Sequence, residues 1–305
     1  MSAEGSNALT AFSEGLATAV ATAGHAVVRV EARQRQAASG VIWADGLIVT
    51  ADHVVEREDS ITVGLPDGKT AAASLVGRAP DNDLALLRIA SGSGTPANQA
   101  PSGSLRTGNL VLAVARPDGD GVQASWGVVS ALGGPARTRG GGLLGGYVRS
   151  GVTMYPGFSG GALVDAQGRV AGLLSSHLGG DAGMAVPSDV VTRLVETLQR
   201  HGRIRRAFLG FRSQPVPIPA AMAERLGRQQ ESGLLVLAVE PGSPSEAAGL
   251  LIGDIIVTFA GQPLQAPDDL QALLATAQIG TAATLALLRG GQPLDLSITP
   301  GDRPQ

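Results

Sequence analysis

Ser159 has the surroundings that a nucleophilic serine needs. It lies in the segment Tyr155-Pro156-Gly157-Phe158-Ser159-Gly160-Gly161, directly before the apolar run 162–164. The glycines leave bare backbone around the serine, so its hydroxyl can protrude and nearby N–H groups can point at one spot in front of it. Acyl transfer requires this combination of a nucleophile and donors aimed at an oxyanion. Taken alone, however, such a segment is more often an ordinary loop between two strands.

Two upstream residues change this balance. His53, one of four histidines, follows the apolar run 47–50, and Asp83 stands at the head of the apolar run 84–89. Individually they fit structural roles, His53 as a packed residue at a strand end and Asp83 as a turn residue. Together with Ser159 they give the chain order His, Asp, Ser, which is the order of the catalytic triad in chymotrypsin-type proteases. The coincidence of three such contexts favours nucleophilic catalysis over chance.

Several segments resemble a known family, in the family's own order. Residues from about 27 to 190 resemble the trypsin-like protease domain of the HtrA (Deg) family, and the segment after Phe208 resembles the PDZ domain that follows it there. The matching stretches of the protease domain are Ser39-Gly40-Val41-Ile42, Thr50-Ala51-Asp52-His53-Val54-Val55, Asp81-Asn82-Asp83-Leu84-Ala85-Leu86-Leu87, Gly127-Val128-Val129-Ser130-Ala131, Pro156-Gly157-Phe158-Ser159-Gly160-Gly161-Ala162-Leu163 and Gly183-Met184-Ala185-Val186-Pro187-Ser188. The resemblance implies a mainly β fold, in which a two-lobed trypsin-like double β-barrel is followed by an α+β PDZ domain.

The resemblance gives a role to each candidate residue. Ser159 is expected as the nucleophile, His53 as the base that takes its proton, and Asp83 as the group that orients the imidazole. Asp81 and Asp52 are rival carboxylates. Asp83 is preferred because it directly precedes the apolar strand, as the family pattern requires. Asp52 is adjacent to His53 and would point away from it on an extended segment.

The backbone N–H groups of Gly157 and Ser159 are the oxyanion donors that the resemblance implies. Two departures from the family lie beside them. Phe158 replaces the usual asparagine, and Met154-Tyr155 replaces the usual Ile-Asn. Because the residue at 158 mainly sets backbone geometry, we expect activity in spite of the change, and we expect any effect to act on the oxyanion hole.

The resemblance also bounds the specificity pocket. In trypsin-like enzymes its base lies six residues before the nucleophile, at Thr153 here. Without an acidic residue at that position, cleavage after arginine or lysine is not expected. The predicted pocket is modest and mainly apolar, which favours small or medium aliphatic residues. Its residues are Thr153, Met154, Leu174, Ser175 and Ser176. His177, in the following loop, is expected to be a surface residue.

A peptide-binding site is implied in the C-terminal region. In HtrA-like PDZ domains a short loop presents N–H groups to the C-terminal carboxylate of a peptide, and the matching residues here are Phe208-Leu209-Gly210-Phe211. Glycine allows the backbone to approach closely, and the strand that follows can accept the peptide by β-augmentation. A helix at 267–277 is expected as the other wall of the groove. Phe208 and Phe211 also fit a structural role as core anchors.

Short strands are the elements expected to position these residues. Glycine and aspartate turns separate short apolar runs, a rhythm typical of barrels or sandwiches. The longer helices are expected at 8–24, 188–201 and 267–277. The glycine-rich stretch 133–146 matches by position a loop that the family uses for regulation, and it fits a merely flexible surface loop as well. The expected parts of the chain are an N-terminal helical segment (1–24), a protease domain (25–200) with lobes at about 25–90 and 105–190, a linker (201–206), a PDZ domain (207–300) and a tail (301–305).

Composition excludes several classes of function. The basic residues are almost all arginine, with Lys69 the only lysine, and the net charge of −3 gives no electrostatic case for nucleic acid or an anionic membrane as partners. No run of about 18 apolar residues predicts a membrane span. Without cysteine, disulfides and thiol chemistry are excluded. No metal-binding or nucleotide-binding motif is visible, so we expect hydrolysis that needs no metal, no other cofactor and no ATP.

The first residues predict a location. Residues 1–24 lack lysine and arginine, contain Glu4 and Glu14, and have an Ala/Thr-rich rather than a Leu-rich apolar stretch, unlike a secretion signal. If the N-terminus is native, the expected compartment is the cytoplasm, although many bacterial relatives are exported.

The sequence therefore predicts an ATP-independent serine endopeptidase that cleaves unfolded or misfolded proteins through an acyl-enzyme, with a PDZ domain that binds free peptide C-termini. The alternative is a catalytically silent HtrA-like scaffold that binds protein C-termini. The resemblance also implies a homotrimer formed through the N-terminal part of the protease domain. That region has few aromatic residues here, which leaves the oligomeric state open.

Overall fold

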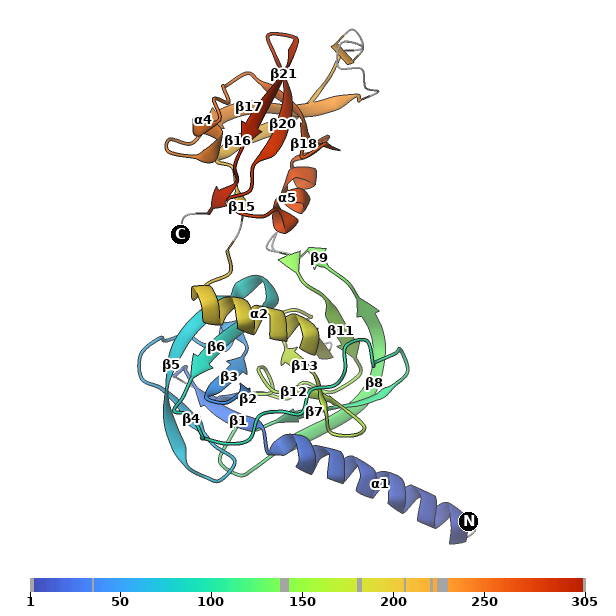
Figure 1. Cartoon of the computed structure of the whole chain (residues 1–305). Coiled ribbons are helices and arrows are strands. Elements are labelled where there is room, and N and C mark those ends of the chain that lie inside the picture. Colours follow the sequence, from blue (N-terminus) through green and yellow to red (C-terminus); the bar gives the residue numbers. More distant parts are fainter. Residues whose placement is uncertain are drawn as a thin grey trace. The chain divides into compact units, whose positions relative to one another are not determined.

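The computed structural model describes residues 3–34, 36–137, 143–179, 183–205, 207–219, 222–223 and 230–303. The chain divides into two compact units, Met1–Ile204 and Arg205–Gln305, which we describe separately (Figure 1). The first unit contains two closed six-stranded barrels and the second contains a sheet with short helices. The predicted mainly β, double-barrel fold is therefore confirmed. None of the helices in the described residues combines the length and the hydropathy needed to cross a bilayer.

The first barrel closes in the order β1-β2-β3-β6-β5-β4. Its strands are β1 (Val27–Glu31), β2 (Ala38–Ala44), β3 (Leu47–Thr50), β4 (Ile61–Gly64), β5 (Thr70–Ala79) and β6 (Leu84–Arg88). Side chains from alternate strand positions fill the interior, as the two-residue period of a strand requires. They include Val28, Val30, Ile42, Ile48, Ile61, Val63, Ala85 and Leu87. Two 3-10 turns, η1 (Asp52–Val54) and η2 (Pro80–Asn82), follow β3 and β5 at the ends of these strands.

The second barrel closes in the order β11-β14-β13-β12-β7-β8. Its strands are β7 (Leu110–Ala115), β8 (Gln123–Gly133), β11 (Tyr147–Ser150), β12 (Ala162–Asp165), β13 (Val170–Ser175) and β14 (Gly183–Pro187). Between β8 and β11, β9 (Ala136–Arg137) pairs with β10 (Leu143–Leu144). This pair belongs to the predicted glycine-rich loop 133–146, of which residues 138–142 lie outside the described residues.

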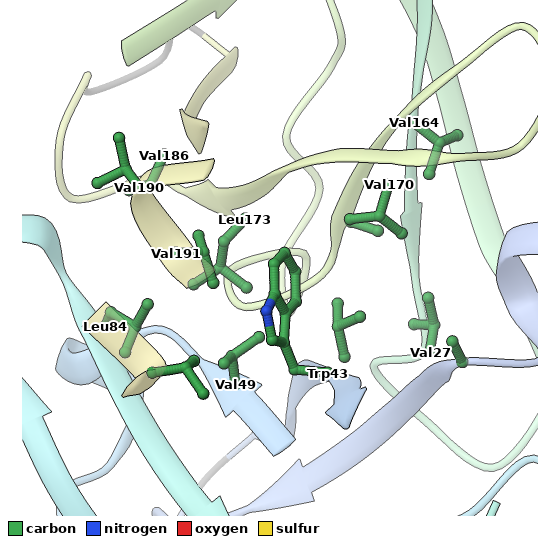
Figure 2. Packing of buried hydrophobic residues seen from close by; sticks show 14 of the residues in the cluster. Val27, Trp43, Val49, Leu84, Val164, Val170, Leu173, Val186, Val190 and Val191 are labelled. Carbon is green, nitrogen blue, oxygen red and sulfur yellow. The ribbon is translucent and has the colours of Figure 1, made fainter. Parts of the chain in front are cut away.

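One apolar cluster joins the two barrels. Figure 2 shows the indole of Trp43, from β2, packed among side chains that include Val49 of the first barrel and Leu173 of the second. The indole N–H donates to the Thr192 hydroxyl at 3.3 Å, so its polar atom is satisfied in this buried position. Truncating an aromatic side chain in such a core typically costs about 3–5 kcal/mol. The cluster therefore holds the two barrels in a fixed arrangement.

Two helices of the first unit contribute to the same cluster. Helix α1 (Ala3–Gly24) includes the predicted helix 8–24 and begins five residues earlier, and it buries Ala19 and Ala23. Helix α2 (Ser188–His201) has the predicted bounds and packs on β5 and β13. It ends at Gly202, whose left-handed backbone (φ +69°) lets its N–H reach the Leu198 carbonyl.

The second unit is built on a sheet with the strand order β16-β17-β18-β20-β21, in which β16 and β21 are the edges. The strands are β15 (Ala207–Phe208), β16 (Phe211–Pro217), β17 (Ser232–Val239), β18 (Ile255–Phe259), β19 (Gln262–Pro263), β20 (Ala283–Arg289), β21 (Gln292–Ile298) and β22 (Gly301–Asp302). Helices α4 (Pro244–Ala247) and α5 (Pro267–Thr276) complete it, and α5 packs beside β15 and β16. Leu234, Val236, Ile256, Phe259, Leu285 and Leu287 form its core.

Candidate active site

His53 lies in the turn η1, and the side chain of Arg78 on β5 bonds to the residues at both ends of this turn. The guanidinium pairs with the Asp52 carboxylate at 2.7 Å and donates to the Val55 carbonyl at 2.8 Å. Both ends of the turn are thereby fixed to a strand of the first barrel. Asp52 is engaged with Arg78, which explains why this neighbouring carboxylate is not the one that contacts the imidazole.

Asp83 approaches the same histidine from the end of η2. It has a left-handed backbone (φ +46°), which is uncommon for a residue other than glycine. One carboxylate oxygen accepts the backbone N–H of His53 at 2.9 Å, and the other lies 2.8 Å from its Nδ1. The Ser175 hydroxyl donates to this second oxygen. The buried carboxylate, 2% exposed, therefore satisfies its acceptors with three donors.

The contact with Asp83 also decides which proton the imidazole carries. A neutral imidazole that donates from Nδ1 to a carboxylate has Nε2 as its acceptor. The side chain of His53 is 25% exposed, so this acceptor is accessible. His177 follows β13, is exposed, and stacks its ring on that of His53 with centroids 5.5 Å apart. The sequence placed His177 at the surface but offered no sign of this contact.

Ser159 is buried, and its hydroxyl is bonded to Ser176. The two hydroxyl oxygens lie 2.9 Å apart, and the backbone N–H of Ser176 donates to Ser159 Oγ at 3.2 Å. Within the described part of the chain these are the hydrogen-bond partners of the Ser159 hydroxyl, and the His53 imidazole is not among them. The structure thus brings His53 and Asp83 into direct contact and shows the serine hydroxyl on a different partner.

The turn before Ser159 fixes the direction of its N–H groups. Phe158 N–H donates to the Tyr155 carbonyl at 3.0 Å, Pro156 occupies the second position, and Gly157 has φ +83°. These are the features of a type II turn, whose central peptide is flipped relative to type I. Among the described residues, no acceptor pairs with the N–H of Gly157 or of Ser159. A Cβ at Gly157 would lie 2.5 Å from the Pro117 Cβ, so glycine is required here.

Phe158 anchors this turn by packing. Its side chain is fully buried in the core of the second barrel, and its ring meets that of Tyr155 edge-on, with centroids 5.3 Å apart. The departure from the family's asparagine therefore places an apolar anchor beneath the turn. The hydrogen bond from the Phe158 N–H to the Tyr155 carbonyl, which closes the turn, forms with phenylalanine at this position.

The residues predicted for the specificity pocket have different surroundings. Thr153 is exposed and its carbonyl accepts the Ser125 hydroxyl at 2.7 Å, while Met154 is half-buried against the second barrel. Leu174 is fully buried in the same core. Ser175 and Ser176 make the contacts with Asp83 and Ser159 described above, so their hydroxyls serve the candidate triad.

In the second unit, the segment 208–211 forms a tight loop before the edge strand β16. Gly210 has φ +83°, and a Cβ there would lie 2.2 Å from the Ser243 Cβ. The carbonyls of Leu209 and Gly210 accept bonds from Ser245 N–H and Glu240 N–H, both at 2.8 Å. The N–H groups of Leu209 and Gly210 have no acceptor among the described residues. Phe208 and Phe211 are half-buried, and Phe211 packs on the core.

Comparisons with known proteins define the class of each unit. Residues 38–173 match the model of the trypsin-like peptidase domain, and residues 222–299 match that of the PDZ domain. The class is therefore a trypsin-like peptidase followed by a PDZ domain. A solved structure of the HtrA-type protease AlgW with a tripeptide is 30% identical with a TM-score of 0.71, and 95% of this chain and 98% of that chain are covered. The chain belongs to the HtrA family, as its sequence predicts.

Curated relatives agree with this family. The chain is 36% identical over 269 residues to the periplasmic pH-dependent serine endoprotease DegQ of Escherichia coli (strain K12), which covers 86% of this chain and 58% of that protein. A probable periplasmic serine endoprotease, DegP-like, of Pseudomonas putida (strain W619) is 34% identical over 281 residues, with 89% and 58% covered. The chain thus spans less than two thirds of the length of these relatives.

The predicted cytoplasmic location is wrong. The curated relatives are named as periplasmic proteins, which points to export. The prediction depended on the absence of a secretion signal from residues 1–24. An absence at the start of a sequence carries no information about the compartment.

Proposed function

We propose that the chain is a serine endopeptidase in which Ser159 attacks the scissile carbonyl, His53 takes the hydroxyl proton and Asp83 orients the imidazole. For attack, the Ser159 hydroxyl exchanges its partner Ser176 for Nε2 of His53. The imidazolium, stabilised by Asp83, then delivers the proton to the leaving amine. Water enters and is activated by the same histidine, and it hydrolyses the acyl-enzyme.

The N–H groups of Gly157 and Ser159 are the proposed oxyanion donors. One observation carries the proposal: among the described residues, neither N–H group has a hydrogen-bond acceptor. Both groups lie in a turn whose type is set by the positive φ of Gly157. Preorganised donors of this kind commonly contribute about 10²–10³-fold each to kcat. A serine beside two unpaired N–H groups, with a histidine already oriented by a buried carboxylate in the same unit, supports acyl transfer.

Covalent labelling tests this proposal. A fluorophosphonate probe should label the wild-type protein once per chain at Ser159, as read by intact mass and peptide mapping. Ser159→Ala should lose both the label and casein cleavage, while Ser74→Ala, which removes an exposed hydroxyl on β5, should keep both. Casein cleavage should proceed without ATP. Absence of labelling in the wild type, with and without an activating peptide, would support the silent scaffold instead.

The proposed specificity pocket consists of Thr153, Met154, Leu174, Ser175 and Ser176. Its composition supports cleavage after small or medium aliphatic residues. The proposed substrates are unfolded or misfolded proteins, since such chains expose apolar residues in extended segments. The names of the curated relatives support proteolysis in the periplasm.

The proposed partner of the second unit is the free C-terminus of a peptide. The unpaired N–H groups of Leu209 and Gly210 can donate to the carboxylate, and the open edge of β16 beside α5 can pair with the peptide backbone. Binding of a labelled apolar peptide, measured by fluorescence anisotropy, should weaken by about tenfold or more when its C-terminus is amidated. Equal affinity of acid and amide would reject the carboxylate as the recognised group.

A homotrimer is the proposed assembly. Leu9 and Phe12 on α1 are 64% and 48% exposed, which supports this helix as part of the subunit contact. Light scattering should give three chains for the wild type and a smaller species for Leu9→Ser with Phe12→Ser. A monomeric wild type would reject the assembly without affecting the proposed chemistry.

A further inference from the structure

Ser39, on β2 of the first barrel, is fully buried and uses each of its polar groups. Its backbone N–H donates to the Ser159 carbonyl at 3.1 Å, and its hydroxyl donates to the Gly157 carbonyl at 2.8 Å. Its own carbonyl accepts the Thr50 hydroxyl at 2.7 Å. A residue of the first barrel therefore holds two carbonyls of the turn that carries the proposed nucleophile.

These two carbonyls belong to peptide groups on either side of the one that carries the Ser159 N–H. In the group 157–158, the carbonyl is held by Ser39 and the N–H by the Tyr155 carbonyl. In the group 159–160, the carbonyl is held by Ser39 and the Gly160 N–H by the Leu174 carbonyl at 2.8 Å. Because each residue has only two soft dihedral angles, fixing both outer planes restricts the plane between them. The intervening group is also held directly, because its Phe158 carbonyl accepts the Gly161 N–H at 2.9 Å. The bonds from Ser39 act together with this one to set the direction of the Ser159 N–H.

Arg116, directly after β7, completes the arrangement. Its backbone N–H donates to the Ser39 hydroxyl at 2.9 Å. A serine hydroxyl has one proton and rotates to suit its partners, so a donor on its oxygen leaves that proton for the Gly157 carbonyl. The guanidinium donates to the Val27 carbonyl at 2.9 Å and to the Gly24 carbonyl at 3.3 Å.

Gly24 is the last residue of α1, so Arg116 lies at the negative end of that helix. Burial lowers the pKa of Arg116 from its usual value. The side chain remains cationic at neutral pH, because arginine titrates far above it. A continuous series of bonds thus runs from the end of α1 through Arg116 and Ser39 to the turn of the proposed nucleophile.

We propose that Ser39 is a positioning residue for the Ser159 N–H as an oxyanion donor, and that Arg116 couples it to the end of helix α1. Ser39 touches no reacting atom. It acts by holding the carbonyls of Gly157 and Ser159, so that the intervening N–H points at the oxyanion. The inference rests on the proposed peptidase function, and wild-type labelling at Ser159 establishes that function independently of it.

The test compares Ser39→Ala with Ser150→Ala. Ser150 is also a buried serine of the first unit, and its hydroxyl donates to the Gly183 carbonyl at 3.0 Å. Both changes remove one buried hydroxyl that donates to a glycine carbonyl. Ser39→Ala also removes the acceptor of the Arg116 N–H. Circular dichroism and thermal melting show whether each variant is folded. If Ser39→Ala does not fold, Ser39→Cys keeps the size of the side chain and offers a weaker donor.

The measurements separate transition-state binding from substrate binding. Removing one oxyanion donor outright costs about 10²–10³-fold in kcat, and loosening one that remains present should cost less, about 10–100-fold. Ser39→Ala should lower kcat by this factor with KM within about twofold. The affinity for a peptide aldehyde, whose hemiacetal oxygen occupies the oxyanion position, should fall in parallel, while that for the matching peptide alcohol stays unchanged. The acid limb of the pH profile should not move, because His53 keeps all its contacts.

Two outcomes would overturn the role of Ser39. One is a Ser39→Ala enzyme with wild-type kcat and aldehyde affinity, and the other is an equal loss in Ser150→Ala. If the wild type itself fails to label, the proposed function fails rather than this inference.

Arg116→Met tests the coupling. It keeps the backbone N–H to Ser39 and removes both side-chain bonds. We expect kcat to fall several-fold at unchanged KM. A rise in KM alone, or no change, would reject the coupling to α1 and leave the role of Ser39 standing.

Discussion

The imidazole of His177 is stacked on that of His53, with ring centroids 5.5 Å apart and ring planes inclined by 23°. His177 is the last of three consecutive residues that each contact one member of the proposed triad. Ser175 donates to the aspartate, and Ser176 bonds the serine. The end of β13 therefore supports the whole proposed catalytic group, and each of its contacts leads to a measurable expectation.

The first expectation concerns the position of the base. The His177 ring lies against the His53 ring, so it limits rotation of the imidazole away from Asp83. A stacked pair of this kind contributes about 0.5–1.5 kcal/mol. His177→Ala removes the contact. We expect kcat for a chromogenic peptide to fall by about two- to tenfold, with KM within about twofold.

The other contacts of His53 remain in that variant, namely those with the Asp83 carboxylate. His177→Phe keeps an aromatic ring at the same place and should retain most of the activity. His201→Ala, in the last turn of α2, is the control for loss of a histidine elsewhere and should leave kcat unchanged. A wild-type kcat in His177→Ala would contradict a positioning role for the stacked ring.

The second expectation concerns the resting position of the nucleophile. Ser176→Ala removes the hydroxyl that bonds Ser159 Oγ and leaves the backbone N–H in place. A hydrogen bond of this kind is worth about 0.5–1.5 kcal/mol, so the Ser159 hydroxyl becomes freer to reach His53. We expect the second-order rate of fluorophosphonate labelling to rise by up to about tenfold. Ser176→Thr keeps a hydroxyl and should label at the wild-type rate, whereas slower labelling of the alanine variant would show that Ser176 assists attack.

The third expectation concerns the base and its carboxylate. His53→Ala and Asp83→Asn should each lower turnover of a chromogenic peptide by about three to four orders of magnitude, with an unchanged circular dichroism spectrum. In Asp83→Asn the amide cannot hold the Nδ1 proton as the carboxylate does. Asp81→Asn is the matched change two residues away. If it proved the more damaging of the two, the carboxylate would be wrongly assigned.

The fourth expectation concerns specificity. Thr153 offers no negative charge, so peptides with valine, alanine or leucine before the scissile bond should be cut faster than those with arginine. The aliphatic residues should also differ among themselves, because one extra or missing methylene in an apolar pocket gives about 10–200-fold discrimination. The comparison of kcat/KM over a peptide series measures it. A preference for arginine would require a carboxylate that reaches the pocket from elsewhere in the protein.

Local patterns were sufficient for much of the fold. Alternating apolar residues marked the strands of both barrels, and the amphipathic run 188–201 marked α2 with its glycine stop. Within the candidate site, the motifs around His53, Asp83 and Ser159 were visible because each combines a chemical group with a recognisable backbone context. The structure places His53 and Asp83 in contact, and their catalytic roles stay a prediction.

The supporting contacts could not be read in the same way. The bond from Ser39 to Gly157 joins positions 118 residues apart, and the stacking of His177 on His53 depends on how the two barrels meet. The spacing of apolar residues along the sequence does not show which strands pair to close a barrel. The hydrogen-bond partner of the Ser159 hydroxyl depends on the χ1 rotamer of that serine, and a rotamer cannot be predicted from the pattern of residues.

The last expectation concerns Asp269, near the start of α5 in the second unit. Its carboxylate accepts the N–H groups of Ala266 and Gln265, both at 2.8 Å, and these bonds lower its pKa from the ordinary value of 3.8. A carboxylate whose pKa is lowered by folding stabilises the fold above its unfolded pKa. That stabilisation is lost as pH falls through the lower, folded value. Asp269→Ala should therefore destabilise α5 by about 1 kcal/mol at pH 7, as for other N-terminal caps, and this difference should shrink below about pH 4.

Hydrogen exchange is the suitable measurement, because both tryptophans and both tyrosines lie in the first unit and do not report on the second. Exchange of the amides of α5, taken as the ratio of variant to wild type at each pH, cancels the intrinsic pH dependence of the chemistry. The ratio should be about fivefold at pH 7 and approach one in acid. Asp269→Asn keeps an acceptor that does not titrate and should lose less protection at pH 7. A ratio for Asp269→Ala that is independent of pH would mean that the charge of the carboxylate does not matter, and that its loss acts only through packing.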